Sequence, residues 1–258
     1  MEQVMKDRLL SIFLLFFIGL SSIAFFCIAS IIWAITALFD RKLTILHYYS
    51  SLWAACYLKI VPAWNVQVVG RQKIDSNKCY IIVSNHLSQL DILACYKLFK
   101  PFKWVSKAEV FKIPFIGWNM VLNRYISIKR GDRAGIKHML LNCEKTLNKG
   151  SSIFIFPEGT RSVDGNIGKF ANGAFALATK LNLPIIPVVI KGAHQALPKN
   201  SLVIRSQHKI TIEVLDPVEP ESFTGKKPSE LASEVRGLIA DKYYDSNTGE
   251  PQGEKEAA

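Results

Sequence analysis

The sequence of 258 residues is poor in cysteine and lacks the common motifs of metal-, nucleotide- and serine-dependent catalysts. Its five cysteines are scattered and include no C-x-x-C pair, which argues against a disulfide framework or a cysteine-based zinc site and suits a reducing compartment. No G-x-S-x-G, H-E-x-x-H, G-x-x-x-x-G-K-S/T or G-x-G-x-x-G motif is present. We therefore predict no metal site and no serine nucleophile.

Acidic residues are outnumbered, with 21 Asp and Glu against 32 Lys and Arg, so the formal net charge is +11. The surplus is concentrated in residues 97–149, which contain 12 basic and three acidic residues. Such a surplus favours nucleic acid, anionic lipid headgroups or phosphorylated small molecules as partners. We predict no nucleic-acid binding, because no known reader motif is present. A hydrophobic content of 49% excludes a disordered chain, and 21% charged residues exclude one wholly buried in a membrane.

Charge is absent from one long stretch near the N-terminus. The 31 residues from Leu9 to Phe39 carry no formal charge. As a helix they would extend about 46 Å, which exceeds the roughly 30 Å hydrocarbon core of a bilayer. A tilted span, an overhang into the headgroups or a shallow position in one leaflet would each accommodate that length. A cleaved signal peptide would have a shorter apolar core and a small-residue cleavage site, so we predict a membrane anchor.

A second apolar segment, Leu43–Ile60, contains interspersed Tyr, Trp and His residues and one Lys near its end. This composition is typical of a helix at a lipid–water interface, and a core helix of the following domain is the alternative. Pro62 ends the segment. We therefore predict an anchor in residues 1–62, an α/β domain in residues 63–245 and a flexible tail in residues 246–258.

The α/β assignment rests on short apolar runs that alternate with helical periodicity. The predicted strands are Trp64–Val69, Tyr80–Ser84, Ser152–Phe156, Ile185–Ile190 and Lys209–Leu215. The predicted helices between and after them are Asp132–Leu147, Lys169–Leu181 and Ser229–Tyr243, with Asp132 as an N-cap.

The first chemically suggestive segment directly follows the predicted strand that ends at Ser84. His86 and Asp91 are five residues apart, a spacing that would separate them on a continuous helix. If His86 lies in the turn and a helix begins near Ser88, Asp91 can accept a hydrogen bond from one imidazole nitrogen and leave the other as a base. A capping box formed by Ser88 and Asp91 is the structural alternative. Main-chain N–H groups after His86 would also be candidates to stabilise an oxyanion.

Two further segments offer groups that suit a polar, phosphorylated ligand. Glu158 and Arg161 lie in a loop containing Pro and Gly after another predicted strand, where a carboxylate can accept from hydroxyls and a guanidinium can bind phosphate. A turn with an internal Glu158–Arg161 ion pair is the alternative. Arg130, after an apolar alternation, is a second phosphate candidate, whereas Lys107 taken singly is typical of solvated surface.

Four short segments together are characteristic of a known family. They are Asn85-His86-x4-Asp91, Ile128-Lys129-Arg130, Phe156-Pro157-Glu158-Gly159-Thr160-Arg161-Ser162 and Leu183-Pro184-Ile185-Ile186-Pro187-Val188. In their order and rough spacing they resemble the motifs of glycerolipid acyltransferases, specifically of lysophosphatidate acyltransferases. The likeness covers roughly Val66 to Val189, and Lys129 departs from it because many family members have an acidic residue there.

The resemblance implies a mixed, largely parallel sheet flanked by helices, together with an N-terminal membrane-associated helical segment. It also implies that His86 removes the proton of an acceptor hydroxyl while Asp91 orients the imidazole. The alkoxide would attack the thioester of acyl-CoA or acyl-carrier protein in one ternary complex, without a covalent acyl-enzyme and without a cofactor. The family's substrate-binding positions correspond here to Arg130, Glu158, Gly159 and Arg161, which would hold the glycerol phosphate. Lys107 and Thr160 are two further candidates for substrate binding.

The function that the resemblance implies is the acylation of lysophosphatidate to phosphatidate, with membrane lipids as partners. The catalytic domain would face the cytoplasm from a membrane, such as a bacterial inner membrane. Glycerol-3-phosphate, lyso-ornithine lipid or another lysophospholipid as acceptor is the nearest alternative. A lipid hydrolase and a non-catalytic lipid-binding protein are the alternatives from other functional classes.

Overall fold

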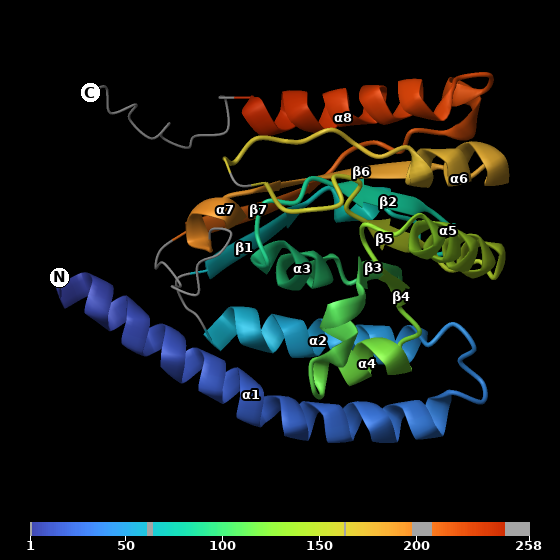
Figure 1. Cartoon of the computed structure of the whole chain (residues 1–258). Coiled ribbons are helices and arrows are strands. Elements are labelled where there is room, and N and C mark those ends of the chain that lie inside the picture. The colour runs from blue at the N-terminus through green and yellow to red at the C-terminus, as the bar shows by residue number, and fades with distance from the viewer. Residues whose placement is uncertain (1, 61–63, 163, 198–207, 246–258) are drawn as a thin grey trace, which may run out of the picture.

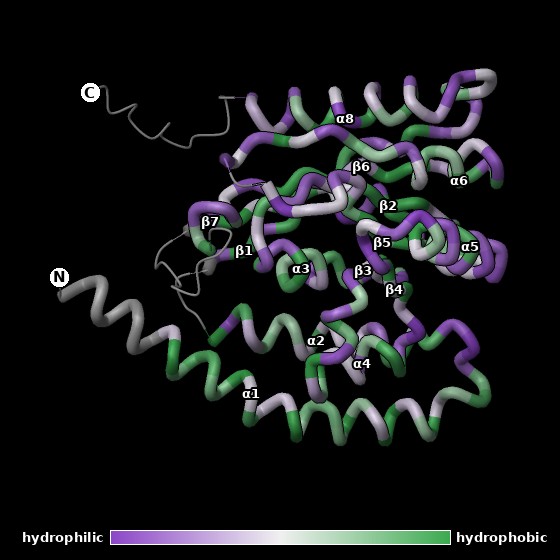
Figure 2. The backbone as a smooth tube through the Cα atoms, viewed as in Figure 1, coloured by the Kyte–Doolittle hydropathy of each residue, from purple (hydrophilic) through white to green (hydrophobic). Residues whose placement is uncertain are grey.

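The computed structural model describes residues 2–60, 64–162, 164–197 and 208–245. Its N-terminal part is a hairpin of two helices, α1 (Glu2–Thr36) and α2 (Thr44–Ile60), which lies along one side of a seven-stranded sheet (Figure 1). The helix α1 is hydrophobic along most of its length (Figure 2). Among the described residues, Ser11–Thr36 is the one stretch long and apolar enough to cross a membrane. The helix thus ends three residues before the apolar run does.

The two helices of the hairpin are joined by hydroxyl and aromatic contacts. The Tyr57 hydroxyl lies 3.1 Å from the Ser21 hydroxyl and 3.0 Å from that of Ser22. The rings of Phe25 and Trp53 stack with their centroids 5.2 Å apart. Elsewhere α1 exposes large apolar side chains: Ile12, Phe13, Phe16, Leu20, Ile31 and Ile35. The helix α1 also contacts the following domain directly, since the centroid of the Phe26 ring lies 5.6 Å from that of Trp118 on α4 (Ile116–Leu122).

The seven strands form one sheet in the order β1-β7-β6-β2-β5-β3-β4. Their bounds are β1 Trp64–Val69, β2 Ile81–Ser84, β3 Lys103–Lys107, β4 Ile126–Ile128, β5 Ile153–Ile155, β6 Ile185–Lys191 and β7 His208–Val214. The five strands from β6 to β4 are mutually parallel, whereas β7 is antiparallel to β6 and parallel to β1. The predicted mixed, largely parallel sheet is confirmed.

Helices cover both faces of the sheet. Their bounds are α3 Leu90–Cys95, α4 Ile116–Leu122, α5 Arg133–Asn148, α6 Gly173–Leu181, α7 Ala193–Ala196 and α8 Pro228–Tyr244, with 3-10 turns η1 Arg71–Lys73, η2 Tyr96–Leu98, η3 Ala108–Lys112 and η4 Pro220–Phe223. In Figure 1, α6 and α8 lie on one face, and α2 and α3 lie on the other. Side chains alternate between the two cores: Ile82 and Phe154 join the α2–α3 side, and Ile81 and Ile153 join the α5–α6–α8 side.

A polar layer is buried where α2 and α4 meet the sheet. We define it by seven residues: His47, Ser50, Tyr96, Lys103, Asn119, Asn123 and Tyr125. His47 Nδ1 lies 2.9 Å from the Tyr125 hydroxyl, and Lys103 Nζ donates to the Asn123 carbonyl at 2.8 Å. Burial lowers the pKa of Lys103 to about 8. The helix α2 is thus attached to the domain by specific hydrogen bonds as well as by apolar packing.

The five predicted strands and three predicted helices are present, with ends that differ by a few residues. The Asp132 side chain accepts from the Ala134 N–H at 2.9 Å, which confirms it as the N-cap of α5. The strands β3 and β4 and the short helices α4 and α7 were not assigned from the sequence, whereas the helix considered near Ser88 is present as α3 and begins at Leu90. The predicted boundary at residues 62–63 and the predicted tail in residues 246–258 lie outside the described residues.

Candidate active site

The predicted site residues follow the carboxyl ends of parallel strands. His86 comes two residues after β2, Arg130 two residues after β4, and Glu158 three residues after β5, while Lys107 is the last residue of β3. Since these strands are parallel, their carboxyl ends meet at one edge of the sheet, where open α/β folds bind their ligands. The fold therefore brings residues up to 72 positions apart to one edge.

His86 and Asp91 form a buried pair in the turn between β2 and α3. His86 Nδ1 lies 2.9 Å from Asp91 Oδ2, and their side chains are 8% and 0% exposed. The helix begins at Leu90, so the turn lets the imidazole fold back onto its first residues. A carboxylate at Nδ1 favours the tautomer with its proton on Nδ1 and leaves the lone pair of Nε2 for a substrate proton. The geometry is that of a base and its orienting acid.

Two further contacts fix the imidazole and its carboxylate. The His86 ring stacks on Phe156 with centroids 4.0 Å apart and planes 12° apart. Asp91 Oδ2 also accepts from the N–H groups of Leu87 and Ser88, both at 2.8 Å. Asp91 therefore performs the predicted capping and the predicted pairing with His86 at once. The expected oxyanion role of the N–H groups after His86 is wrong for Leu87 and Ser88, because Asp91 occupies both.

Two residues beside the pair have contacts that the sequence did not reveal. The Asn85 side chain donates to the Ile190 carbonyl and accepts from the Ile190 N–H, both at 2.9 Å, and so ties the turn to the adjacent strand β6. His194, on α7, places Nδ1 3.4 Å from the Leu87 carbonyl. Asn85 adjoins His86 in the first motif, which is a local indication. No local sequence pattern indicates the contact of His194, because His194 and Leu87 are 107 residues apart and meet only through the position of β6 in the sheet.

Glu158 links the third motif to the first. Its Oε1 accepts from the His86 N–H at 2.7 Å, and its Oε2 accepts from the Gly168 N–H at 2.8 Å. Burial raises the pKa of the Glu158 carboxyl, whereas these two N–H groups oppose the rise. The Ser162 N–H adds a third link by donating to the His86 carbonyl at 3.1 Å. Glu158 therefore holds the His86 turn and keeps lone pairs for a hydroxyl donor.

The predicted cations Arg130 and Arg161 influence one another electrostatically. Partial burial lowers the pKa of Arg130, Glu109 raises it and Arg161 lowers it further, so all three charges are within electrostatic reach. Lys107, the last residue of β3, also belongs to this group of charges, because its Nζ lies 3.6 Å from Glu109 Oε1. Two guanidinium groups near one another suit a dianionic phosphate, because each supplies a planar pair of donors.

Gly159 and Thr160 lie in the loop between Glu158 and Arg161, and both are exposed. Gly159 has a φ of 70°, a conformation that side-chain-bearing residues rarely adopt, and its N–H donates to the Phe156 carbonyl at 3.1 Å. The glycine therefore turns the chain sharply after β5 and presents Thr160 and Arg161 at the surface. Within the described ranges, no three His, Cys, Asp or Glu side chains are grouped as a metal site would require.

Comparison with known proteins identifies relatives of this chain. A family model described as Acyltransferase matches residues 65–191. A chloroplastic 1-acyl-sn-glycerol-3-phosphate acyltransferase from Arabidopsis thaliana is 33% identical over 93% of this chain and 66% of its own length. A 1-acyl-sn-glycerol-3-phosphate acyltransferase from Pseudomonas aeruginosa is 34% identical over 55% of this chain and 54% of its own. The chain belongs to the acyltransferase family.

The fold of this chain occurs in a solved structure. The crystal structure of a 1-acyl-sn-glycerophosphate acyltransferase from Thermotoga maritima matches it with a TM-score of 0.77 and 21% identity, covering 96% of this chain and 100% of that one. The chain spans less than two thirds of the length of the curated relatives it matches, namely 66% of the Arabidopsis protein and 58% of a Brassica napus one. The region matched to the family includes the His86–Asp91 pair, Arg130 and the Glu158–Arg161 loop.

Proposed function

We propose that this acyltransferase transfers a fatty acyl group from a thioester to the free hydroxyl of lysophosphatidate and so forms phosphatidate. The observation that carries the proposal is the His86–Asp91 pair, 2.9 Å apart, at the edge where the site loops converge. The names of the curated relatives, which are 1-acyl-sn-glycerol-3-phosphate acyltransferases, support this choice of acceptor. The donor is acyl-CoA or acyl-carrier protein, and the reaction needs no cofactor.

In the proposed mechanism His86 Nε2 takes the proton of the acceptor hydroxyl as its oxygen attacks the thioester carbonyl. Asp91 stabilises the imidazolium that forms. The tetrahedral intermediate collapses with cleavage of the carbon–sulfur bond, and the leaving thiolate receives the proton from His86. An ester and a free thiol result. Because the bound hydroxyl is the nucleophile, correct positioning replaces a covalent acyl-enzyme and can supply several kcal/mol.

The acceptor is positioned by the loops after β3, β4 and β5. Arg130 and Arg161 hold its phosphate, and Lys107 contributes a further positive charge. Glu158 accepts from a glycerol hydroxyl with the lone pairs that its two main-chain N–H partners leave free. Gly159 and Thr160 shape the loop against the glycerol backbone. This arrangement would place the free hydroxyl against His86.

The hairpin of α1 and α2 would anchor the acyltransferase where its substrates reside. Lysophosphatidate and phosphatidate carry acyl chains and partition into a bilayer, and α1 exposes many large apolar side chains. We place residues 1–62 in or on the membrane and residues 63–245 on the cytoplasmic side of a bacterial inner membrane. Basic residues at the site would attract the anionic headgroup of the acceptor.

The decisive experiment uses the purified full chain in phosphatidylcholine vesicles with lysophosphatidate and either acyl-CoA or acyl-carrier protein. Phosphatidate is measured by mass spectrometry. His86→Ala should lower the turnover by at least about 100-fold, the contribution of a general base. The matched control is His138→Ala, since His138 is exposed on α5 and is not one of the proposed site residues. Equal turnover by His86→Ala would refute the role of His86.

A panel of acceptors separates the alternatives within and beyond the family. If the protein acylates glycerol-3-phosphate, lyso-ornithine lipid or another lysophospholipid but not lysophosphatidate, that compound replaces the proposed acceptor. The panel includes these acceptors because Lys129 stands where many family members have an acidic residue. Release of free fatty acid without any acceptor would show a hydrolase. Binding of lipid without turnover of any acceptor would show a non-catalytic protein.

A further inference from the structure

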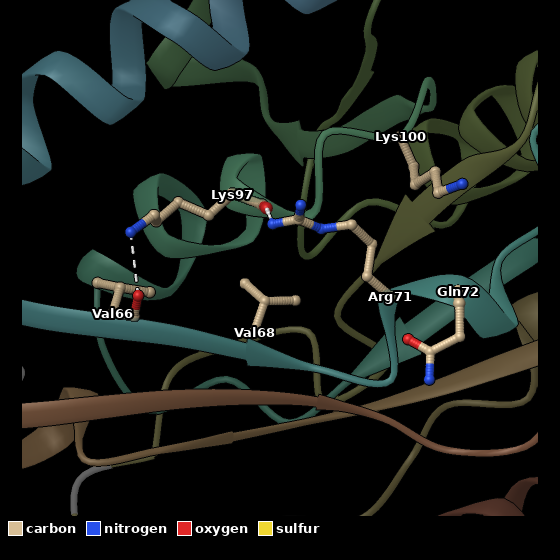
Figure 3. A pocket seen from close by; sticks show the side chains of 6 residues that line it. All are labelled: Val66, Val68, Arg71, Gln72, Lys97 and Lys100. Atoms are coloured by element: carbon tan, nitrogen blue, oxygen red, sulfur yellow. Dashed lines mark hydrogen bonds between the residues drawn. The ribbon is translucent and has the colours of Figure 1, made fainter.

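A second basic site lies outside the acyltransferase site. A cavity of about 450 Å³ is lined by Val66 and Val68 of β1, by Arg71 and Gln72 of η1, and by Lys97 and Lys100 around η2. Three of these six residues are cations, and none is a carboxylate. Figure 3 shows Arg71 extended from the end of β1 across the cavity toward the main chain of Lys97.

The topology places this cavity at the end of the sheet opposite His86. Because β1 runs antiparallel to β2, its carboxyl end lies where β2 begins, and Arg71 and Gln72 follow that end. Lys100 precedes β3, which is parallel to β2, so Lys100 also lies at the amino-terminal end. The cavity is therefore separate from the groups proposed to bind the acceptor.

The cations of the cavity are held by uncharged partners. Arg71 donates from one terminal nitrogen to the Lys97 carbonyl at 2.7 Å, and Lys97 Nζ donates to the Val66 carbonyl at 3.0 Å (Figure 3). Lys100 Nζ donates to the Ser76 hydroxyl at 3.1 Å. Within the described part of the chain, none of the three forms an ion pair. Their neighbour Lys73 differs, since its Nζ lies 2.9 Å from Asp216 Oδ1.

These contacts fix the cationic heads while leaving donors unused. The Arg71 guanidinium has further N–H groups besides the one that meets Lys97, and each lysine ammonium has three protons. Held in place without a carboxylate, the three positive charges repel one another, so an anion between them would relieve that repulsion. Val66 and Val68 add an apolar wall suited to the carbon portion of an ester.

We propose that this cavity binds a phosphate group, with Arg71 and Lys97 as its principal ligands. A guanidinium fork and an ammonium point charge are the groups with which proteins hold phosphate. The phosphate can belong to the headgroup of an anionic phospholipid or to a soluble phosphate ester. Because the cavity is remote from His86, its occupation is independent of acyl transfer.

The first test is calorimetric titration of the detergent-solubilised full chain with inorganic phosphate. If Arg130 and Arg161 also bind phosphate, the wild type shows two sites, and Arg71→Gln/Lys97→Gln should lose one of them. Since each charge-assisted hydrogen bond is worth roughly tenfold or more in affinity, the double variant should weaken that site by at least about 100-fold. Unchanged phosphate binding by the double variant would overturn the proposal.

A pair of Gln→Glu variants guards against a loss that merely reflects misfolding. Gln72→Glu adds a carboxylate to the cavity and removes none of its hydrogen bonds, whereas Gln67→Glu adds one on the exposed opposite face of β1. Gln72→Glu should weaken the site roughly tenfold through repulsion and should leave the turnover of lysophosphatidate unchanged. An equal loss in Gln67→Glu, or in Lys73→Gln, would show general surface attraction and refute a built site.

The source of the phosphate is then identified with phosphatidylcholine nanodiscs that contain or lack phosphatidylglycerol. If a lipid headgroup fills the cavity, native mass spectrometry should show an additional retained phosphatidylglycerol that Gln72→Glu loses and Gln67→Glu keeps. If a soluble ester fills it, Gln72→Glu should lower the affinity for glycerol phosphate with no change in retained lipid. Each result supports the phosphate site, and a failure of both arms would overturn it.

Discussion

The two faces of the sheet differ in the chemistry of their cores. The face covered by α5, α6 and α8 is closed mainly by aliphatic side chains, with Phe170, Phe175 and Phe223 as its buried aromatics. The face toward α2 and α3 is rich in aromatic rings and contains the polar layer. On that face, packed aromatics continue from Trp104 through Phe156 to the His86 ring.

This difference in core chemistry suggests that one face of the sheet contributes mainly to stability and the other mainly to the positions of specific groups. Aliphatic packing gains most of its free energy from burial and tolerates changes of shape. Buried hydrogen bonds specify one arrangement, because leaving a partner unpaired costs about 1–3 kcal/mol. The α5–α6–α8 face therefore supplies stability, and the α2–α3 face supplies the position of the hairpin and of the imidazole. Four substitutions test this division.

The largest expected effect is on catalysis at the α2–α3 face. Asp91→Asn should lower the turnover by about 10³–10⁴-fold, because an amide no longer stabilises the imidazolium or fixes the proton on Nδ1. Turnover is measured at saturating lysophosphatidate and donor. Asp132→Asn, at the N-cap of α5, is the matched control and should retain full turnover. A loss of less than tenfold in Asp91→Asn would contradict the pairing of His86 with Asp91.

The opposite face should respond in stability. Phe175 is fully buried against Phe170, and Phe175→Ala should lower the free energy of unfolding by about 3–5 kcal/mol while the folded fraction keeps its turnover. Denaturant unfolding in detergent measures this. Leu238→Ala, at a 43% exposed position on α8, should change stability by less than about 0.5 kcal/mol. If Phe175→Ala keeps the wild-type free energy of unfolding but has a reduced turnover, the assignment of stability to the α5–α6–α8 face is wrong.

Lys103 in the polar layer should make stability depend on alkaline pH. Burial lowers its pKa from 10.5 to about 8 in the folded protein, so between these values the unfolded chain binds more protons. Stability should therefore rise with pH from about 8 to 10.5, by about 3 kcal/mol at most, and fall again on acidification. Thermal unfolding measured as a function of pH should show no such rise in stability for Lys103→Met, whereas the exposed control Lys137→Met should show it. Parallel curves of stability against pH for the wild type and Lys103→Met would contradict this prediction.

The smallest expected effect concerns Glu158. Burial raises its pKa, so acidification protonates it at a higher pH than an exposed glutamate, and one of its two N–H partners then loses an acceptor. Glu158→Gln should imitate the protonated state and lower the turnover about tenfold at neutral pH. Its pH profile should also lack one ionisation on the acidic side. The exposed control Glu221→Gln should retain the wild-type turnover and the acidic ionisation of the pH profile. A wild-type pH profile in Glu158→Gln would contradict the role of Glu158 in holding the His86 turn.

Much of the fold was predictable because local sequence determines it. The cores of β2, β5 and β6 are continuously apolar, as strands covered on both faces must be. The strand β3 was missed because it begins and ends with lysine, and only the polar layer explains why Lys103 is buried there. The strand β4 has three residues and gives too short a pattern. The direction of β1 and β7 depends on pairing between distant segments, which no local pattern records.

In the candidate site, too, the contact between sequence neighbours was predictable, whereas contacts between distant segments were not. The contact between His86 and Asp91 was predictable because five residues and one turn connect them. The contacts of Glu158 with His86 and of Asn85 with Ile190 join segments 72 and 105 residues apart. A single sequence shows that such groups exist but not which of their atoms meet. The occupation of the Leu87 and Ser88 N–H groups by Asp91 was hidden for a different reason, because hydrogen-bond competition within a turn requires coordinates.

The reversed direction of β1 has a geometric consequence. Since β1 runs against β2, its first residue lies at the same end of the sheet as the turn that carries His86, and α2 ends just before it in sequence. Under the proposed placement of the hairpin in the membrane, the chain would join the domain at the edge of the sheet that carries His86. In that placement the fold itself would set the distance between the imidazole and the lipid surface.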